Sequence, residues 1–242
     1  QSRQTGLLSL RSNVIGIEEN SMSKVIVVTD STSNIPPELL KNQPVKILPL
    51  YVVWGDQTYK DGVDIEAKEF YERLAVDKIL PSTSQITPED FKKEYNDLLK
   101  EGYDILSIHI SSKLSGTLDS AVQAKKTLPN TRIELVDSQS TSMALGFQVL
   151  RASQMAKNGA SLEECKSMAE KSISHSGVFF AVNTLEFLYR GGRIGGAAAF
   201  MGHVLHLKPL LELRDGKIEA VEKVRTLSKT IDRLLDLVEA KI

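Results

Sequence analysis

Short apolar runs alternate with segments of helical periodicity along most of the chain after Lys24. The apolar runs are rich in β-branched residues and have the length of buried strands. They are "KVIVVTD" (24–30), "DILSIHIS" (104–111) and "RIELVDS" (132–138). Helix-like segments follow the last two runs, at 117–128 and 141–159. This alternation predicts an α/β fold with a Rossmann-like, mostly parallel sheet that carries helices on both faces.

Proline, glycine and polar clusters predict several shorter elements in the first part of the chain. Proline favours the first turn of a helix, and a glycine beside an acidic residue favours a tight turn between two strands. The predicted elements are a short helix in "PPELLKN" (36–42), a hairpin through Gly55-Asp56, a helix over 66–75, a loop over 81–85, and a helix from Pro88 to Gly102.

The pattern changes after Gly159. Ser161 stands three residues before Glu164, which is the spacing of a capping box at the start of a helix. Strand-like runs follow this helix, and Asp215-Gly216 joins two of them as a hairpin. An amphipathic helix over 226–242 closes the chain. Hairpins combined with helices predict a second unit of the α+β type.

This division of the chain gives three segments. We predict an N-terminal α/β domain over 22–159 and a C-terminal α+β domain over 160–242. Residues 1–21 are interpreted as an extension, native or added for expression, because Met22 precedes the first strong strand. These residues lack a continuous apolar core, so we expect no signal peptide.

The composition is typical of a soluble globular protein, with 41% hydrophobic and 25% charged residues. Lys and Arg number 30 against 31 Asp and Glu, so no nucleic-acid partner or anionic membrane surface is indicated. The single cysteine, Cys165, excludes an internal disulfide and a cysteine-based metal cluster, and it favours a cytoplasmic protein. The longest apolar stretch, at 194–207, is shorter than the roughly 20 residues that cross a bilayer. We therefore expect no integral membrane segment and no metal site.

Three turns rich in hydroxyl groups follow or lie between the predicted core elements, at 30–34, 81–85 and 111–117. Open α/β sheets bind ligands beyond the carboxyl ends of their strands, where helix N-termini offer free N–H groups. A hydroxyl there can accept a backbone proton as a cap and donate its own proton outward, and Ser115 is placed for both. Each turn alone is more typical of a cap. The three together leave a cap and a ligand site as equal alternatives.

Several kinds of catalytic site are not indicated by the sequence. The glycines of "GGRIGG" (191–196) follow a helix-like segment instead of a strand, which argues against a nucleotide fingerprint. No serine has the G-x-S-x-G context of a nucleophile elbow. His109 lies in a buried strand and is typical of a core histidine. His175, His203 and His206 lack the spacing of a metal site.

Arg193 lies between two glycine pairs, followed by a run of small residues. The local sequence favours a solvated loop arginine. The alternative is an arginine presented to an anion or to a partner protein, for which its planar fork of donors is suited.

Six motifs in order give a resemblance to a known family. They are "VTDSTSNIP" (28–36), "PSTSQITPEDF" (81–91), "ISSKLSGTLDSA" (110–121), "VDSQSTSMALG" (136–146), "GGRIGGAAA" (191–199) and "KPLLELRDGKIEAVEKVRT" (208–226). From about Lys24 to its end the chain resembles the DegV family, bacterial fatty-acid-binding proteins that serve as carrier subunits of a fatty acid kinase. The resemblance implies two α/β domains with a long-chain fatty acid, such as palmitate, stearate or oleate, buried between them.

The resemblance also implies roles for three residues. Thr83 of T-S-Q and Ser115 of S-G-T are expected to bind the ligand carboxylate, and Arg193 of GGRIG to contact the kinase. The carrier is then not an enzyme and has no cofactor, because an ATP-dependent partner forms the acyl phosphate for phospholipid synthesis. One alternative is a small-molecule hydrolase or transferase with Ser115 as nucleophile, against which the missing base beside Ser115 counts. The other is an interaction domain without a ligand.

One feature of the family pattern is missing at the C-terminus. Family members continue for several dozen residues and carry a His-x-Gly-Pro-Gly-like motif, whose histidine lies near the carboxylate. This chain stops at Ile242, and none of its 4 histidines is followed by Gly-Pro-Gly. We therefore expect a truncated C-terminal domain without that histidine and without its final strand.

Overall fold

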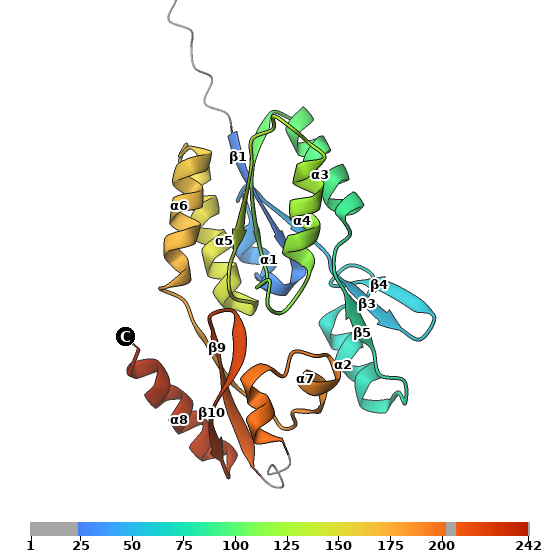
Figure 1. The fold of residues 1–242 in the computed structure, drawn as a ribbon, viewed down its shortest axis with the longest axis vertical. Helices are drawn as coiled ribbons and strands as arrows, with labels where there is room; N and C mark the ends of the chain where they lie inside the picture. The colour runs from blue at the N-terminus through green and yellow to red at the C-terminus, as the bar shows by residue number, and fades with distance from the viewer. Residues whose placement is uncertain (1–23, 202–206, 242) are drawn as a thin grey trace, which may run out of the picture.

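A four-stranded parallel sheet organises the fold. The computed structural model describes residues 24–201 and 207–241, so the predicted extension at 1–21 lies outside the described residues. The strands are β1 (Lys24–Asp30), β2 (Val45–Leu48), β6 (Tyr103–His109) and β7 (Ile133–Asp137), in the order β2-β1-β6-β7 (Figure 1). β1 is central, with Val28 opposite Lys46 of β2 and Ser107 of β6. The predicted parallel sheet is confirmed, and the predicted short helix is α1 (Pro37–Leu40) between β1 and β2.

Helices cover both faces of this sheet (Figure 1). α3 (Pro88–Lys100) and α4 (Thr117–Lys126) lie on one face, and α5 (Ser142–Lys157) and α6 (Leu162–Ile173) lie on the other. Successive residues of a strand point to opposite sides of a sheet. In β6, Ile105 therefore packs in the core under α3 and α4, whereas Leu106 packs in the core under α5 and α6. Burial on both faces explains why these strands are continuous apolar runs in the sequence.

α6 packs with the parallel sheet and not with the C-terminal part of the chain. Its apolar face shares one buried core with α5, β1 and β6 through Leu162, Cys165 and Ala169. The predicted boundary near Gly159 lies between two helices that bury their apolar faces together, which favours a later boundary. We propose that the first unit ends after Ile173.

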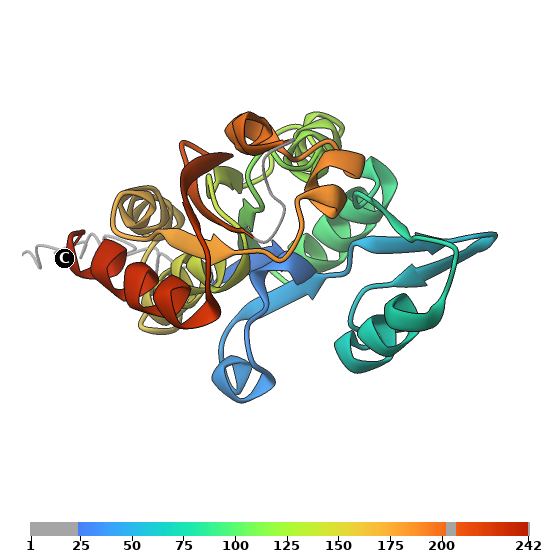
Figure 2. The same ribbon diagram turned by 90° about the horizontal axis from the view of Figure 1, so that it is seen from below.

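A smaller antiparallel sheet projects from the side of the first unit (Figures 1 and 2). It consists of β3 (Tyr51–Trp54), β4 (Gln57–Lys60) and β5 (Ser82–Ser84), in the order β4-β3-β5, with α2 (Ala67–Val76) packed on it. The hairpin predicted at Gly55-Asp56 joins β3 and β4. The predicted loop at 81–85 is wrong for its central part, because Thr83 pairs with Val52 in β5. All three side chains of β5 are exposed, so no apolar alternation marks this strand in the sequence.

The C-terminal part forms a second antiparallel sheet with the strand order β10-β9-β8. Its elements are β8 (Val178–Ala181), α7 (Glu186–Arg190), the 3-10 helix η2 (Gly195–Phe200), β9 (Lys208–Arg214), β10 (Lys217–Val224) and α8 (Leu227–Glu239). The hairpin predicted at Asp215-Gly216 joins β9 and β10. α8 is amphipathic as predicted, and Leu227, Ile231 and Leu235 of its apolar face are exposed. No helix in the described ranges combines the length and the hydropathy that crossing a bilayer requires.

The tip of the β9–β10 hairpin rests on the first unit. Ser111, in the turn after β6, is fully buried and donates through its hydroxyl to the Gly216 carbonyl at 2.8 Å. A Cβ atom on Gly216 would lie 2.3 Å from the Ser111 hydroxyl oxygen, and Gly216 has a φ of +76°. Both the close approach and the left-handed backbone require glycine at this turn.

Candidate functional site

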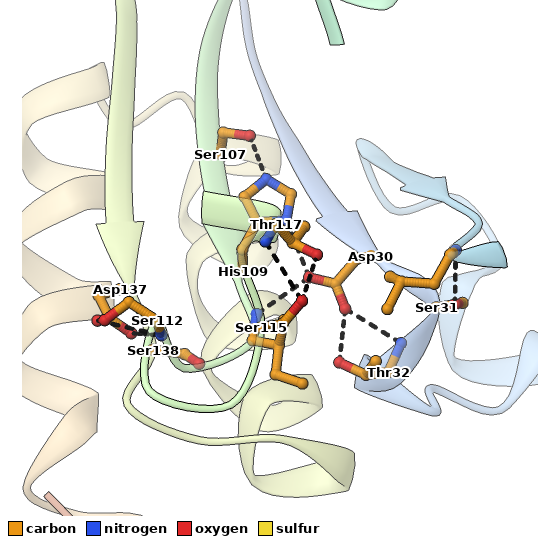
Figure 3. Close-up of polar contacts among 12 residues, drawn as sticks. Asp30, Ser31, Thr32, Ser107, His109, Ser112, Ser115, Thr117, Asp137 and Ser138 are labelled. Carbon is orange, nitrogen blue, oxygen red and sulfur yellow. Dashed lines mark hydrogen bonds and ion pairs between the residues drawn. The ribbon is translucent and has the colours of Figure 1, made fainter. Parts of the chain in front are cut away.

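Two of the hydroxyl-rich turns, at 30–34 and 111–117, lie at the carboxyl edge of the parallel sheet, and several of their hydroxyls hold the turns together (Figure 3). The Ser31 hydroxyl accepts the Leu50 N–H at 3.1 Å, after β1. After β6, the Ser112 hydroxyl donates to the Asp137 carboxylate at 2.5 Å. These side chains are therefore used by the fold itself, which leaves few hydroxyls for a ligand.

Ser115 lies in the turn that leads into α4. Its hydroxyl oxygen accepts the Thr117 N–H at 3.3 Å and lies 2.9 Å from the Thr117 hydroxyl oxygen (Figure 3). Gly116, between these two residues, leaves no room for a side chain, because a Cβ atom would lie 2.0 Å from Gln85 Oε1. This glycine allows the Ser115 turn to lie directly against the T-S-Q segment.

Thr83 reaches the same place from β5. Two residues further on, Gln85 donates through Nε2 to the Ser120 hydroxyl of α4 at 2.8 Å, and this bond ties β5 to the first turns of α4. The Thr83 side chain is exposed, and its hydroxyl has no hydrogen-bond partner within the described ranges. Thr83 therefore has a donor and an acceptor available for a ligand.

Arg193 extends from the C-terminal part onto the Ser115 turn. Its Nε donates to the Leu114 carbonyl at 2.8 Å, and its Nη1 donates to the Gly191 carbonyl. The side chain is exposed, as expected for a solvated loop arginine, but its guanidinium group does not extend freely into solvent. The guanidinium group instead braces the residue before Ser115.

A cavity of about 270 Å³ brings these residues together. Its wall contains all three predicted site residues, Thr83, Ser115 and Arg193, together with Thr32 from the turn after β1. The apolar part of the wall includes Val52 of β3, Ile110 and Leu114 from the turn after β6, Leu188 of α7 and Ile218 of β10. A mainly apolar wall with a few converging polar groups is typical of a small-molecule site. A groove of about 620 Å³ beside α5 and α8 is larger, but it contains none of the three residues.

A buried hydrogen-bond network, which the sequence did not reveal, links the carboxyl ends of β1 and β6 beside the cavity. The Asp30 carboxylate lies 2.9 Å from His109 Nδ1, and it also accepts the Ile110 N–H at 3.0 Å and the Thr32 hydroxyl at 2.5 Å (Figure 3). Burial acts to raise the pKa of Asp30, but the bonds and charge of His109 and the bonds of Thr32 and Ile110 outweigh it and lower this pKa. Asp30 is therefore ionised and fixes the positions of two residues in the cavity wall, Thr32 and Ile110.

The network continues into the core through a serine and a tyrosine. Burial raises the pKa of Tyr95, so Tyr95 keeps its proton and donates to the Ser107 hydroxyl at 2.7 Å. Ser107 can then donate to His109 Nε2, 2.6 Å away, while His109 Nδ1–H donates to Asp30. Every donor in the network has an acceptor in this arrangement. His109 is thus a satisfied core histidine, as predicted.

The same geometry bears on the hydrolase alternative. The order Ser107, His109 and Asp30 resembles a catalytic triad, but Ser107 is fully buried and bonded to Tyr95. Ser115 contacts no histidine within the described ranges. His175 is exposed and bonds the Lys171 carbonyl, whereas His203 and His206 lie outside the described residues. Within the described ranges, Ser115 therefore has no hydrogen bond to a general base.

Comparison with known proteins identifies the family. The model of the DegV family, described as uncharacterised proteins, matches residues 24–242. The chain belongs to the DegV family. The Bacillus subtilis protein DegV is 36% identical over 223 residues, which cover 89% of this chain and 77% of that protein.

Solved structures give the same result for the fold. A DegV family protein of Thermus thermophilus, described as binding fatty acid, is 40% identical with a TM-score of 0.83, covering 90% of this chain and 78% of its own. A stearic-acid-binding protein of Eubacterium ventriosum is 28% identical with a TM-score of 0.83, covering 90% of this chain and 76% of its own. The α/β architecture predicted from the sequence is therefore that of the family.

Proposed function

We propose that this protein binds a long-chain fatty acid and presents its carboxylate to an ATP-dependent fatty acid kinase. The observation that carries the proposal is the cavity that joins Thr83, Ser115 and Arg193 to an apolar wall. The relatives described as binding fatty acid, one of them with stearic acid, support this class of ligand. We expect palmitate, stearate and oleate to bind, without a cofactor.

The two ends of the ligand contribute differently to binding. In the proposed complex, Thr83 and Ser115 donate to the carboxylate, and the nearby Arg193 guanidinium offsets its charge. Hydrogen bonds to a charged group are worth about 1.5–3 kcal/mol each. Burial of the acyl chain is worth about 0.8 kcal/mol per methylene, so a long chain supplies most of the affinity. The head group then fixes the orientation of the carboxylate.

The chemistry in this proposal belongs to a partner. Ser115 has no hydrogen bond to a base among the described residues, so in this proposal hydroxyls and an arginine bind the acid without reacting with it. In the kinase, a carboxylate oxygen attacks the γ-phosphorus of ATP, which gives an acyl phosphate and releases ADP. Arg193, exposed beside the cavity, is the proposed contact for the kinase. We place this reaction in cytoplasmic phospholipid synthesis.

Native mass spectrometry of the purified protein tests the ligand class. We expect a co-purified mass of a fatty acid, or uptake of one molecule of added palmitate or oleate. Thr83→Ala should weaken the uptake, and Thr127→Ala, at the far end of α4, is the matched control. A protein that carries no lipid and takes up neither acid would refute the proposal.

A further inference from the structure

The start of α4 contains a buried hydroxyl whose direction can be deduced. Thr117, the first residue of α4, is fully buried. Within the described ranges its hydroxyl has a single hydrogen-bond partner, the Ser115 hydroxyl oxygen at 2.9 Å. The Thr117 N–H also points to this oxygen, at 3.3 Å. Ser115 is thus contacted twice by the same buried residue (Figure 3).

The donor in the hydrogen bond between the Ser115 and Thr117 hydroxyls can be assigned. A buried donor without an acceptor is unfavourable, and the Thr117 proton has no acceptor other than Ser115 among the described residues. Thr117 must therefore donate, and Ser115 accepts both from the Thr117 hydroxyl and from the Thr117 N–H. Both lone pairs of the Ser115 oxygen are then occupied, which leaves its own proton directed elsewhere. The cavity that Ser115 lines is the open side.

The Thr32 hydroxyl, which also lines the cavity, behaves in the opposite way. Thr32 donates its proton to the ionised Asp30 carboxylate at 2.5 Å, so toward the cavity it offers only lone pairs. The contrast shows that the two hydroxyls are set by different buried neighbours. Of Thr32 and Ser115, only Ser115 directs its proton toward the cavity.

We propose that Thr117 is a positioning residue that fixes the Ser115 hydroxyl as a proton donor toward an anionic head group. This inference rests on the proposed function and deepens it, because it names what makes Ser115 ready for a carboxylate before the ligand arrives. A hydroxyl that accepts a hydrogen bond becomes a stronger donor, so Thr117 also strengthens the bond from Ser115 to the ligand. Thr117 itself does not touch the ligand.

A double-mutant cycle with palmitate as the probe tests the inference by isothermal titration calorimetry on delipidated protein. Thr117→Val removes the donor and keeps the shape, and we expect it to weaken palmitate binding about fivefold. Thr117→Ser keeps the donor and should restore most of this loss. Because Thr117 acts only through Ser115, the double variant Ser115→Ala/Thr117→Val should bind no more weakly than Ser115→Ala alone. Thr127→Val, at the other end of α4, should bind like the wild type.

Each outcome decides the question. Unchanged binding by Thr117→Val, a loss that adds to that of Ser115→Ala, or no recovery with Thr117→Ser would overturn the positioning role. If Thr117→Val does not fold, Thr117→Ala replaces it in the same cycle. A wild-type protein that binds no palmitate refutes the proposed function itself. Wild-type binding with an additive cycle refutes only the role of Thr117.

Discussion

Gly116→Ala tests how the two halves of the head-group site are held together. The new Cβ atom would lie 2.0 Å from Gln85 Oε1 and 2.8 Å from its Cδ, so the Gln85 side chain must move. Its bond to the Ser120 hydroxyl, a fully buried group, is then lost. Gly116 has φ −77° and ψ 6°, which alanine adopts without strain. The effect of the substitution is therefore steric and not conformational.

The expected magnitude follows from two opposing terms. A hydrogen bond lost from a buried hydroxyl lowers the free energy of unfolding by about 1–3 kcal/mol. Replacing glycine by alanine at an unstrained position raises it by about 0.4–1 kcal/mol, because the unfolded chain loses entropy. We expect a net decrease of about 0.5–2 kcal/mol, and weaker palmitate binding as Thr83 and Ser115 move apart.

Urea denaturation followed by circular dichroism measures this change. At a typical slope of about 2 kcal/mol per molar urea, the midpoint should fall by about 0.5 M with no change of slope. Gly177→Ala is the matched control, because its Cβ atom would meet no heavy atom within 4 Å. It should be slightly more stable than the wild type. Equal midpoints for the two alanine variants would show that Gln85 does not hold the T-S-Q segment on α4.

Two further substitutions test the arginine and the buried aspartate. Arg193→Ala should slow acyl-phosphate formation with the kinase more than it weakens palmitate binding, because the proposed role of Arg193 is to contact the kinase. Equal losses in the two assays would contradict that role. Burial acts to raise the pKa of Asp30, but the bonds and charge of His109, followed by other hydrogen bonds, lower it below the unfolded value. As the pH falls, the Asp30 carboxylate is therefore protonated in the unfolded chain before it is protonated in the folded one. The ionised Asp30 stabilises the fold fully above about pH 4, and this stabilisation is lost as the pH drops through the lowered pKa. Asp30→Asn should be less stable at pH 7 and show a flatter loss of unfolding free energy in acid, and an unchanged acid slope would contradict the assigned pKa direction.

The parts of the structure that sequence patterns predict are those with local signals. β1 and β6 are buried on both faces, so each is a mainly apolar run that is recognisable by itself. The Asp215-Gly216 hairpin is marked by its turn residues. The family motifs assigned Thr83 and Ser115 to the ligand carboxylate and Arg193 to the kinase, and the structure brings all three to one cavity. The roles of these residues in binding the fatty acid and the kinase stay predictions.

The features that were missed depend on contacts between distant residues. Asp30 and His109 are 79 positions apart, and no local pattern indicates that they share a buried hydrogen bond. β5 is a strand only because β3 lies beside it, since its own residues are polar and exposed. The periodicity of α6 shows that one face is apolar, but it does not show which element covers that face. In the structure, α5 and the parallel sheet cover it.

The Ser111–Gly216 contact has a consequence for how a loaded protein can be told from an empty one. Ser111 and Ser115 belong to one short turn, so a ligand that immobilises Ser115 also restrains the turn on which the β9–β10 hairpin rests. In the proposed complex we therefore expect the ligand to reduce the mobility of the β9–β10 hairpin. A partner that docks on this hairpin would favour the loaded form without contacting the ligand.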